Sequence, residues 1–148
     1  MKDYKYALSV YGREDLVNDL LDTNNLKEAN VSKEVAYKYL ETLLDHIEYV
    51  SEAGLELGLD RGQCIQHDGS KFNDMEFYSY AKQFQGEGDS EFFPYAWLDH
   101  IHRNEHHWEY WVFPDGYNYI RKGKTIPSPS VEDGVVIMPE KYVRELIS

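Results

Sequence analysis

Apolar side chains recur at three- and four-residue steps between residues 35 and 50, which is the spacing of one face of an α-helix. They are Val35, Tyr39, Leu43, Ile47 and Val50. Ser32 precedes the pattern and is a good N-cap, because its hydroxyl can accept a hydrogen bond from a free backbone N–H. We therefore predict a helix from Ser32 that frays near Gly54 or Gly58. His46 lies on the edge of the apolar stripe, so we expect its ring to point inward.

Shorter helices are predicted on both sides of this one. Residues 13–22 form an acidic amphipathic pattern, and the following TNNLKEAN is interpreted as a loop or a frayed turn. A short helical segment ends at His67-Asp68, since Gly69 and Ser70 interrupt it. Asn73 then caps a new helix, with Glu76 in the capping-box position. Its apolar candidates are Met75, Tyr78 and Phe84.

The last third of the chain changes character. Pro94 fits the first turn of a helix that carries AWLDHIHRNEHHWEYWV. The segment 113–138 is rich in turn residues and is compatible with a short β-hairpin. Residues 139–147 are predicted to form a terminal helix. The expected fold is all-α: one domain over 1–148, a bundle of four to six helices with its core at about 30–112.

Composition limits the possible partners. The net charge is -12 with 15 Lys and Arg, which disfavours duplex nucleic acid because its phosphates must be neutralised. No apolar run is long enough to cross a membrane, and the N-terminus lacks the apolar run of a signal peptide. The single cysteine, Cys64, excludes an internal disulfide. We therefore expect a cytoplasmic protein, and the sequence leaves a homodimer open.

Four of the six histidines lie within residues 100–107. In an unbroken helix His100 and His107 share one face, whereas His102 and His106 share another, so only one pair can face the core. Asn104 could end or kink the helix. We expect the tryptophans of this region to pack around the buried face; they are Trp97, Trp108 and Trp111.

The stretch HDGSKF, residues 67–72, places a histidine, an aspartate and a lysine on one turn. Taken singly, each candidate has an ordinary structural interpretation. His46 can be a hydrogen-bonded core histidine, HDGSKF a polar loop, and residues 100–107 an exposed histidine-rich tract. Taken together they can converge in a bundle core. Neutral imidazoles and carboxylates are ligands of Mn, Fe, Ni, Co or Zn, so we predict a metal site with one or two ions. The predicted ligands are His46, His67, Asp68, His100, His106 and His107.

The order of His46, His67-Asp68 and the later histidines resembles the HD-domain metal-dependent phosphohydrolases, whose fold is an all-α bundle with the metal in its core. The HDxxK form ending at Lys71, together with a later paired His-His, looks most like the HD-GYP branch. The position one turn before His46, a glutamate in that branch, is Thr42. Residues 35–112 also resemble an uncharacterised family of small proteins found largely in phages and their bacterial hosts.

The resemblance implies hydrolysis of a small phosphorylated substrate, such as a nucleotide, in a bacterial cell or phage-infected host. Asp68 would orient the attacking water and Lys71 would pair with phosphate oxygens. Asn104 and Trp108 would hold the rest of the nucleotide. Two alternatives remain open: a diiron oxygenase of HD fold, and a non-enzymatic acidic interaction protein with a structural metal site.

Overall fold

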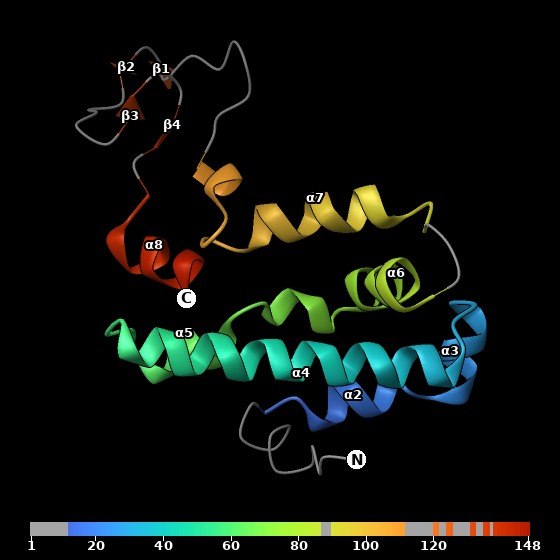
Figure 1. Ribbon diagram of the computed structural model, residues 1–148. Helices are drawn as coiled ribbons and strands as arrows, with labels where there is room; N and C mark the ends of the chain where they lie inside the picture. The colour runs from blue at the N-terminus through green and yellow to red at the C-terminus, as the bar shows by residue number, and fades with distance from the viewer. Residues whose placement is uncertain are drawn as a thin grey trace.

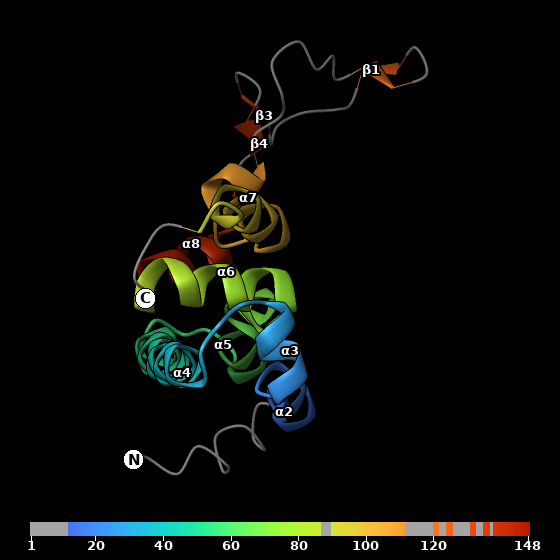
Figure 2. The same cartoon turned by 90° about the vertical axis from the view of Figure 1, so that its right-hand side faces the viewer.

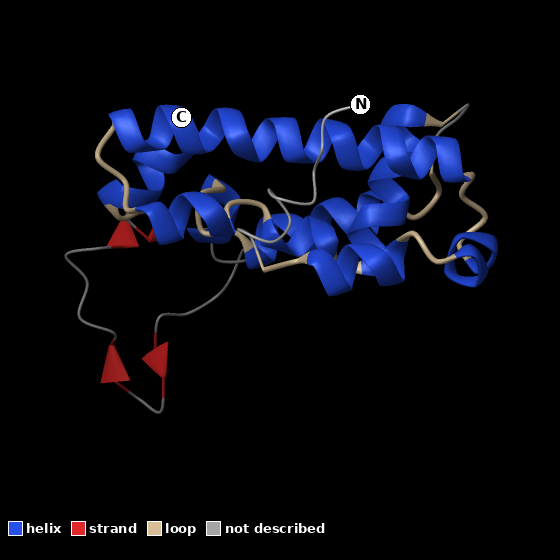
Figure 3. Cartoon of the chain, turned by 90° about the horizontal axis from the view of Figure 1, so that it is seen from below, coloured by secondary structure: helices blue, strands red, loops and turns tan. Residues whose placement is uncertain are grey.

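The computed structural model describes residues 12–86, 90–111 and 138–148, and the backbone of four two-residue strands between 120 and 136. The fold is all-α, as predicted (Figures 1 and 3). Its helices are α2 (Glu14–Leu20), α3 (Thr23–Glu28), α4 (Lys33–Glu56), α5 (Arg61–Gln66), η1 (Gly69–Phe72), α6 (Asp74–Gln85), α7 (Phe93–Arg103), η2 (Trp108–Trp111) and α8 (Glu140–Ile147), of which η1 and η2 are 3-10 turns.

The long helix α4 runs the length of the helical part, with α2 on one side of it and α6 and α7 on the other (Figure 1). α5 and α6 pack against it, and α6 in turn packs against α7, so the helices form layers (Figure 2). α8 lies beside the end of α7 and contacts α4. This arrangement places the turn between α5 and α6 beneath both α7 and α8.

The predicted stripe on α4 forms the core. Tyr39, Leu43, Ile47 and Val50 are buried, whereas Val35 is partly exposed at the helix start. Ser32 caps the helix through a 3.2 Å bond from the Val35 N–H to its Oγ. The helix ends at Glu56, and Gly58 follows with a φ of +82°. The start and the end both agree with the prediction.

The prediction of a loop or a frayed turn at TNNLKEAN was wrong, because residues 23–28 form the helix α3. Asp22 caps this helix by accepting bonds from the N–H groups of Asn24 and Asn25. Leu26 is buried against the core, and this tertiary contact stabilises a segment with little helical preference of its own. The described residues consequently contain more α-helices than the predicted four to six.

The prediction for α6 was right in position and for Tyr78, which is partly buried against the core, but it was wrong in other details. The side chain of Asn73 makes no capping bond, and Glu76 is fully buried instead of capping the helix. Met75 and Phe84 are exposed. The buried apolar face is formed instead by Phe77, Tyr80 and Ala81.

Pro94 lies in the first turn of α7, as predicted. However, α7 ends at Arg103 rather than continuing to residue 112, because the backbone of Asn104 is extended. Further along, β1 (Ile120–Arg121) pairs with β2 (Lys124–Thr125), and β3 (Val131–Glu132) pairs with β4 (Val135–Val136), both antiparallel. The short hairpin predicted in this segment is thus present twice, and α8 follows at the predicted terminal position.

Candidate metal centre

A turn between α5 and η1 carries the central carboxylate. α5 ends at Gln66, and Asp68 adopts the left-handed conformation with a φ of +53°, which aspartate tolerates better than most residues. One 3-10 turn then forms through the bond from the Lys71 N–H to the Asp68 carbonyl. The turn brings the Lys71 Nζ to 2.6 Å from Asp68 Oδ2. Asp68 itself is buried.

Two histidines face Oδ2 of Asp68. His46 on α4 places its Nε2 at 3.0 Å from Oδ2, and the His67 Nε2 lies at 3.5 Å. The two Nε2 atoms are 3.1 Å apart. The expectation that His46 points inward needs correction, because its side chain is 45% exposed. Its nitrogen reaches the site from the rim, while the ring of His67 is buried.

Three further histidines gather at the other carboxylate oxygen. The Nε2 atoms of His100 and His106 lie 3.3 and 3.2 Å from Asp68 Oδ1. The His107 Nε2 lies 2.9 Å from the His100 Nε2. Because α7 ends before Asn104, His106 joins His107 beside His100, whereas an unbroken helix would place His106 on a different face from His100. His102 is exposed on α7 and is not part of this cluster.

Two buried glutamates, which the sequence did not suggest as site residues, contact the opposite edges of these rings. Glu145 Oε1 on α8 lies 3.0 Å from the His67 Nδ1 and 3.3 Å from the His106 Nδ1. Glu76 Oε2 on α6 lies 3.0 Å from the His100 Nδ1. The sequence carried no signal for either residue, because Glu76 was expected to cap its helix and the apolar Val143, Leu146 and Ile147 of α8 are exposed while Glu145 is buried.

Asn104 and Ser70 complete the surroundings of His100. The Asn104 Nδ2 donates to the Ser70 Oγ at 2.8 Å and to the His100 carbonyl at 2.7 Å. The Ser70 hydroxyl donates to Glu76 Oε2 at 2.9 Å. Trp108 is exposed on η2, and Trp97 stacks on the ring of His100 with 6.0 Å between centroids. The expectation that all three tryptophans pack around a buried face therefore fails for Trp108.

The electrostatics of the cluster favour a cation. Burial raises the pKa of the Asp68 carboxyl, but the rings of His100, His106 and His46, with Lys71, hold it well below its usual range. Burial lowers the pKa of His106, yet the contacts with Asp68 and Glu145 outweigh this effect and raise it to about 9. The carboxylates that favour a proton on this ring also favour other cations beside it.

The rings of His67 and His107 have lowered pKa values and therefore favour the neutral state. Burial is the main cause that lowers the pKa of His67, and it lowers that of His107 to about 4, with further repulsion from His106 and His100. For Glu145, burial is outweighed by the bonds from His106, His67 and Gln63, which lower its pKa to about 2. Neutral rings and ionised carboxylates are the protonation states in which these groups bind metals.

A cleft of about 500 Å³ reaches the cluster from the side of α5 and α8. Ser70, His106 and Glu145 belong to both the cleft wall and the site. Arg103 and Lys141 also line the cleft, from α7 and α8. The buried site is therefore open to a small molecule at one edge.

The spacing of the donor atoms matches the edges of a metal coordination shell. With metal–nitrogen bonds of about 2.0–2.1 Å, neighbouring ligand atoms on one ion are separated by roughly 3.0–3.4 Å. The contacts of His46, His100 and His106 with Asp68 lie at 3.0–3.3 Å. Among the described residues, Asp68 Oδ1 is buried without a hydrogen-bond partner despite this proximity. A buried carboxylate oxygen that lacks a partner and has two ring nitrogens beside it is a place where a cation can bind.

The fold and this cluster define a small all-α protein with buried groups of histidine, aspartate and glutamate that could hold a metal ion. The chain belongs to the Family of unknown function (DUF5662), which matches residues 35–148. The match includes Asp68, Glu145 and the clustered histidines. Nothing matches the chain among curated proteins or among solved structures. Among the residues that the structure describes, no helix is long and apolar enough to cross a membrane.

Proposed function

We propose that this protein is a metal-dependent phosphohydrolase of HD-domain type that acts on a small phosphorylated substrate such as a nucleotide. The observation that supports it most is the convergence of four imidazoles, those of His46, His67, His100 and His106, on the two oxygens of Asp68, with His107 beside His100. Among the described residues Asp68 Oδ1 has no hydrogen-bond partner, and a buried polar atom in that state is costly. A cation beside it would remove that cost.

The residues present fit one or two ions, which Asp68 and the histidines around it would hold. One group comprises Asp68 with His100, His106 and His107, and another comprises Asp68 with His46 and His67. A divalent transition metal bound there would supply a Lewis acid and a bound water of lowered pKa. Mn, Fe, Ni, Co and Zn all accept this set of nitrogen and oxygen donors.

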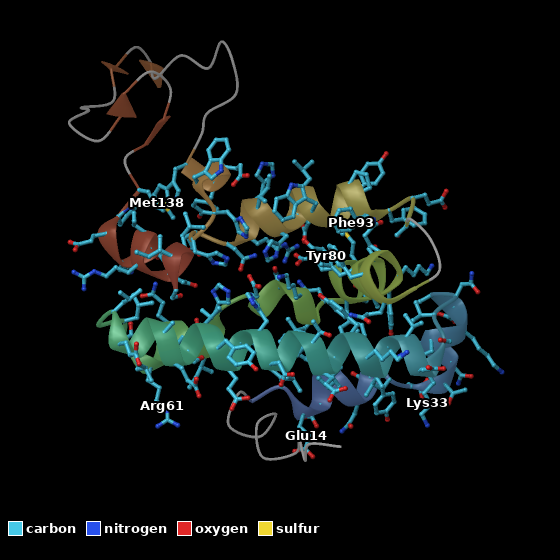
Figure 4. All side chains as sticks on the ribbon, viewed as in Figure 1. Glu14, Lys33, Arg61, Tyr80, Phe93 and Met138 are labelled. Carbon is cyan, nitrogen blue, oxygen red and sulfur yellow. The ribbon has the colours of Figure 1, made fainter. Side chains whose placement is uncertain are left out.

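The chain's own groups supply the rest of the chemistry. Asp68 is held ionised and can orient a water or accept its proton. Lys71 lies beside Asp68 and is 17% exposed, so its ammonium group can turn toward a phosphate oxygen and stabilise developing negative charge. Its Nζ also lies 5.4 Å from the ring centroid of Tyr80. Figure 4 shows Tyr80 between α6 and α7.

The cleft suggests how a substrate would lie. Lys141 offers positive charge on its wall, which suits a second anionic group of a nucleotide, whereas Arg103 pairs with Asp99. The exposed indole of Trp108 is available for stacking on a base. Asn104 directs its amide hydrogens at protein groups, so a contact with substrate would use its Oδ1. The cytoplasm of a bacterium or phage-infected host would supply such nucleotides.

The test is metal content followed by hydrolysis. Protein without a histidine tag is purified, and bound metals are measured by elemental analysis. We expect a stoichiometric transition metal in the wild type and none in the His67→Ala/Asp68→Ala double variant, with the fold retained by circular dichroism. His102→Ala is the matched control and keeps the metal. A screen of nucleotides and phosphoesters should then show hydrolysis that depends on that metal.

The absence of metal in the wild type, even after reconstitution with each of the five metals, would overturn this proposal. Stoichiometric metal without hydrolysis would favour the second candidate, an interaction protein with a structural metal site. That candidate is supported by exposed apolar side chains along α7 and beyond it; these are Phe92, Tyr95, Trp97, Leu98 and Trp108. Oxygen consumption that depends on iron would instead identify a diiron oxygenase.

A further inference from the structure

Glu145 occupies a position that differs from those of the predicted ligands. It lies on α8, 78 residues along the chain from His67, and it is buried. Its Oε1 contacts the Nδ1 atoms of both His67 and His106, at 3.0 and 3.3 Å. These are the edges of the two rings that face away from Asp68. One carboxylate oxygen therefore contacts two candidate ligands at once.

The contacts select one tautomer for each ring. A neutral imidazole carries a proton on one nitrogen and a lone pair on the other. Because an ionised carboxylate only accepts hydrogen bonds, a neutral His67 or His106 ring, the form that binds a metal, must carry its proton on Nδ1. Both Nε2 atoms are then left with their lone pairs directed toward the region of Asp68. Glu76 makes the same contact with the Nδ1 of His100, at 3.0 Å.

The other oxygen of Glu145 is also held. The side-chain amide of Gln63 on α5 donates to Oε2 and, at 3.1 Å, to the carbonyl of Lys141 on α8. Gln63 thus fixes both the rotamer of Glu145 and the start of α8. The carboxylate is consequently oriented before any ion binds, which is what a group that aligns other ligands requires.

We propose that Glu145 is a positioning residue of the metal centre, which holds His67 and His106 as Nδ1–H tautomers and thereby links α8 to the site. This inference rests on the metal centre of the proposed function but not on its hydrolytic chemistry. Carboxylate partners of metal-binding histidines raise the basicity of the ring and fix its orientation. Glu145, His67 and His106 could also hold an ion among themselves. Such an ion would require both Nδ1 atoms to lose their protons, and each ring would then bind metal through both of its nitrogens. A ligand role for Glu145 is therefore less favourable than a positioning role.

The experiment compares Glu145→Gln with Glu140→Gln. Both variants remove one carboxylate from α8, but Glu140 is 78% exposed and pairs with Arg144 on the surface. The probe is Co²⁺, titrated into metal-free protein and followed by its visible absorption. We expect Glu145→Gln to weaken Co²⁺ binding roughly 10- to 100-fold with the number of bound ions unchanged, and Glu140→Gln to bind as the wild type does.

A second readout does not depend on metal. Nitrogen-15 NMR of the imidazoles in the metal-free protein should show Nδ1–H tautomers for His67 in the wild type and a mixture in Glu145→Gln, with the ring of His100 unchanged. Unchanged Co²⁺ affinity and tautomers in Glu145→Gln would overturn the proposal, and so would the loss of one bound Co²⁺, which would make Glu145 a ligand. If Co²⁺ binding and tautomers respond as expected but no substrate is hydrolysed, the positioning role stands and the proposed hydrolase activity fails.

Discussion

Asp68 is the residue on which the candidate site depends, because its two oxygens serve different groups of histidines. Oδ2 faces His46 and His67, and Oδ1 faces His100 and His106. The left-handed backbone at Asp68 directs this carboxylate into the space between α4 and α7. A single residue thus connects histidines from helices that lie far apart in the sequence.

Two histidines four residues apart should differ in their effect on metal binding. His106→Ala removes a ring nitrogen 3.2 Å from Asp68 Oδ1, so we expect metal affinity to fall by more than about 100-fold. His102→Ala changes an exposed ring and should leave the affinity unchanged. Isothermal titration with Zn²⁺ measures both variants. Equal losses in the two variants would contradict the assignment of the cluster.

Lys71 should contribute to hydrolysis rather than to metal retention. Lys71→Met removes the cation beside Asp68 while keeping a side chain of similar length, so we expect kcat/KM to fall about 100-fold with the metal content unchanged. The measurement is the hydrolysis rate on the substrate found in the screen. The control is Lys38→Met, which breaks an exposed pair with Glu34 on α4. If Lys71→Met lost its metal, the lysine would have a structural role.

At the scale of elements, the end of α7 determines which histidines meet. The helix stops at Arg103, and the extended backbone at Asn104 redirects the chain so that His106 and His107 approach His100. The amide of Asn104 reinforces this change of direction, since it joins the His100 carbonyl to the Ser70 hydroxyl. The break in the helix is therefore part of the site.

We expect Asn104→Ala to destabilise the protein, because it leaves the buried groups of Ser70 and His100 without their donor. The free energy of unfolding should fall by about 1–3 kcal/mol in urea denaturation of the metal-free protein. Asn18→Ala, on the exposed side of α2, is the control and should have little effect. An Asn104→Ala variant of unchanged stability would indicate that Asn104 serves only a substrate.

At the scale of the whole molecule, the site connects segments that contribute to different layers. α4 carries His46, the turn after α5 carries Asp68, α7 carries His100, and α8 carries Glu145 (Figure 1). An ion at this position would bind only the folded chain, since the donors are brought together by packing. Metal binding should therefore stabilise the entire fold.

Removal of metal by a chelator should lower the thermal midpoint, and return of the metal should restore it. At a free metal concentration about 100 times Kd, linkage predicts roughly 2.7 kcal/mol of stabilisation, or about 5–11 °C for a domain of this size. The measurement is a circular dichroism melt with EDTA and after Zn²⁺ addition. Asp68→Ala should show no such shift. A similar shift in that variant would place the bound metal elsewhere.

Local patterns along the sequence were sufficient to predict several features. The apolar stripe and cap of α4, the proline at the start of α7, the terminal helix and the all-α class all depend on neighbours within a few residues. The convergence of His46, His67, Asp68 and the later histidines could be anticipated because imidazoles and carboxylates on inward faces share one core. The function of these residues stays a prediction.

Only the tertiary structure determined the remaining features. α3 depends on the burial of Leu26 against other helices, and Glu76 and Glu145 become parts of the site because α6 and α8 dock with those faces inward. The presence of His106 in the cluster without His102, which would share its face in an unbroken helix, depends on the break after Arg103. Periodicity along a chain identifies the buried face of a helix, but the partner of each buried polar group depends on how helices distant in sequence pack together.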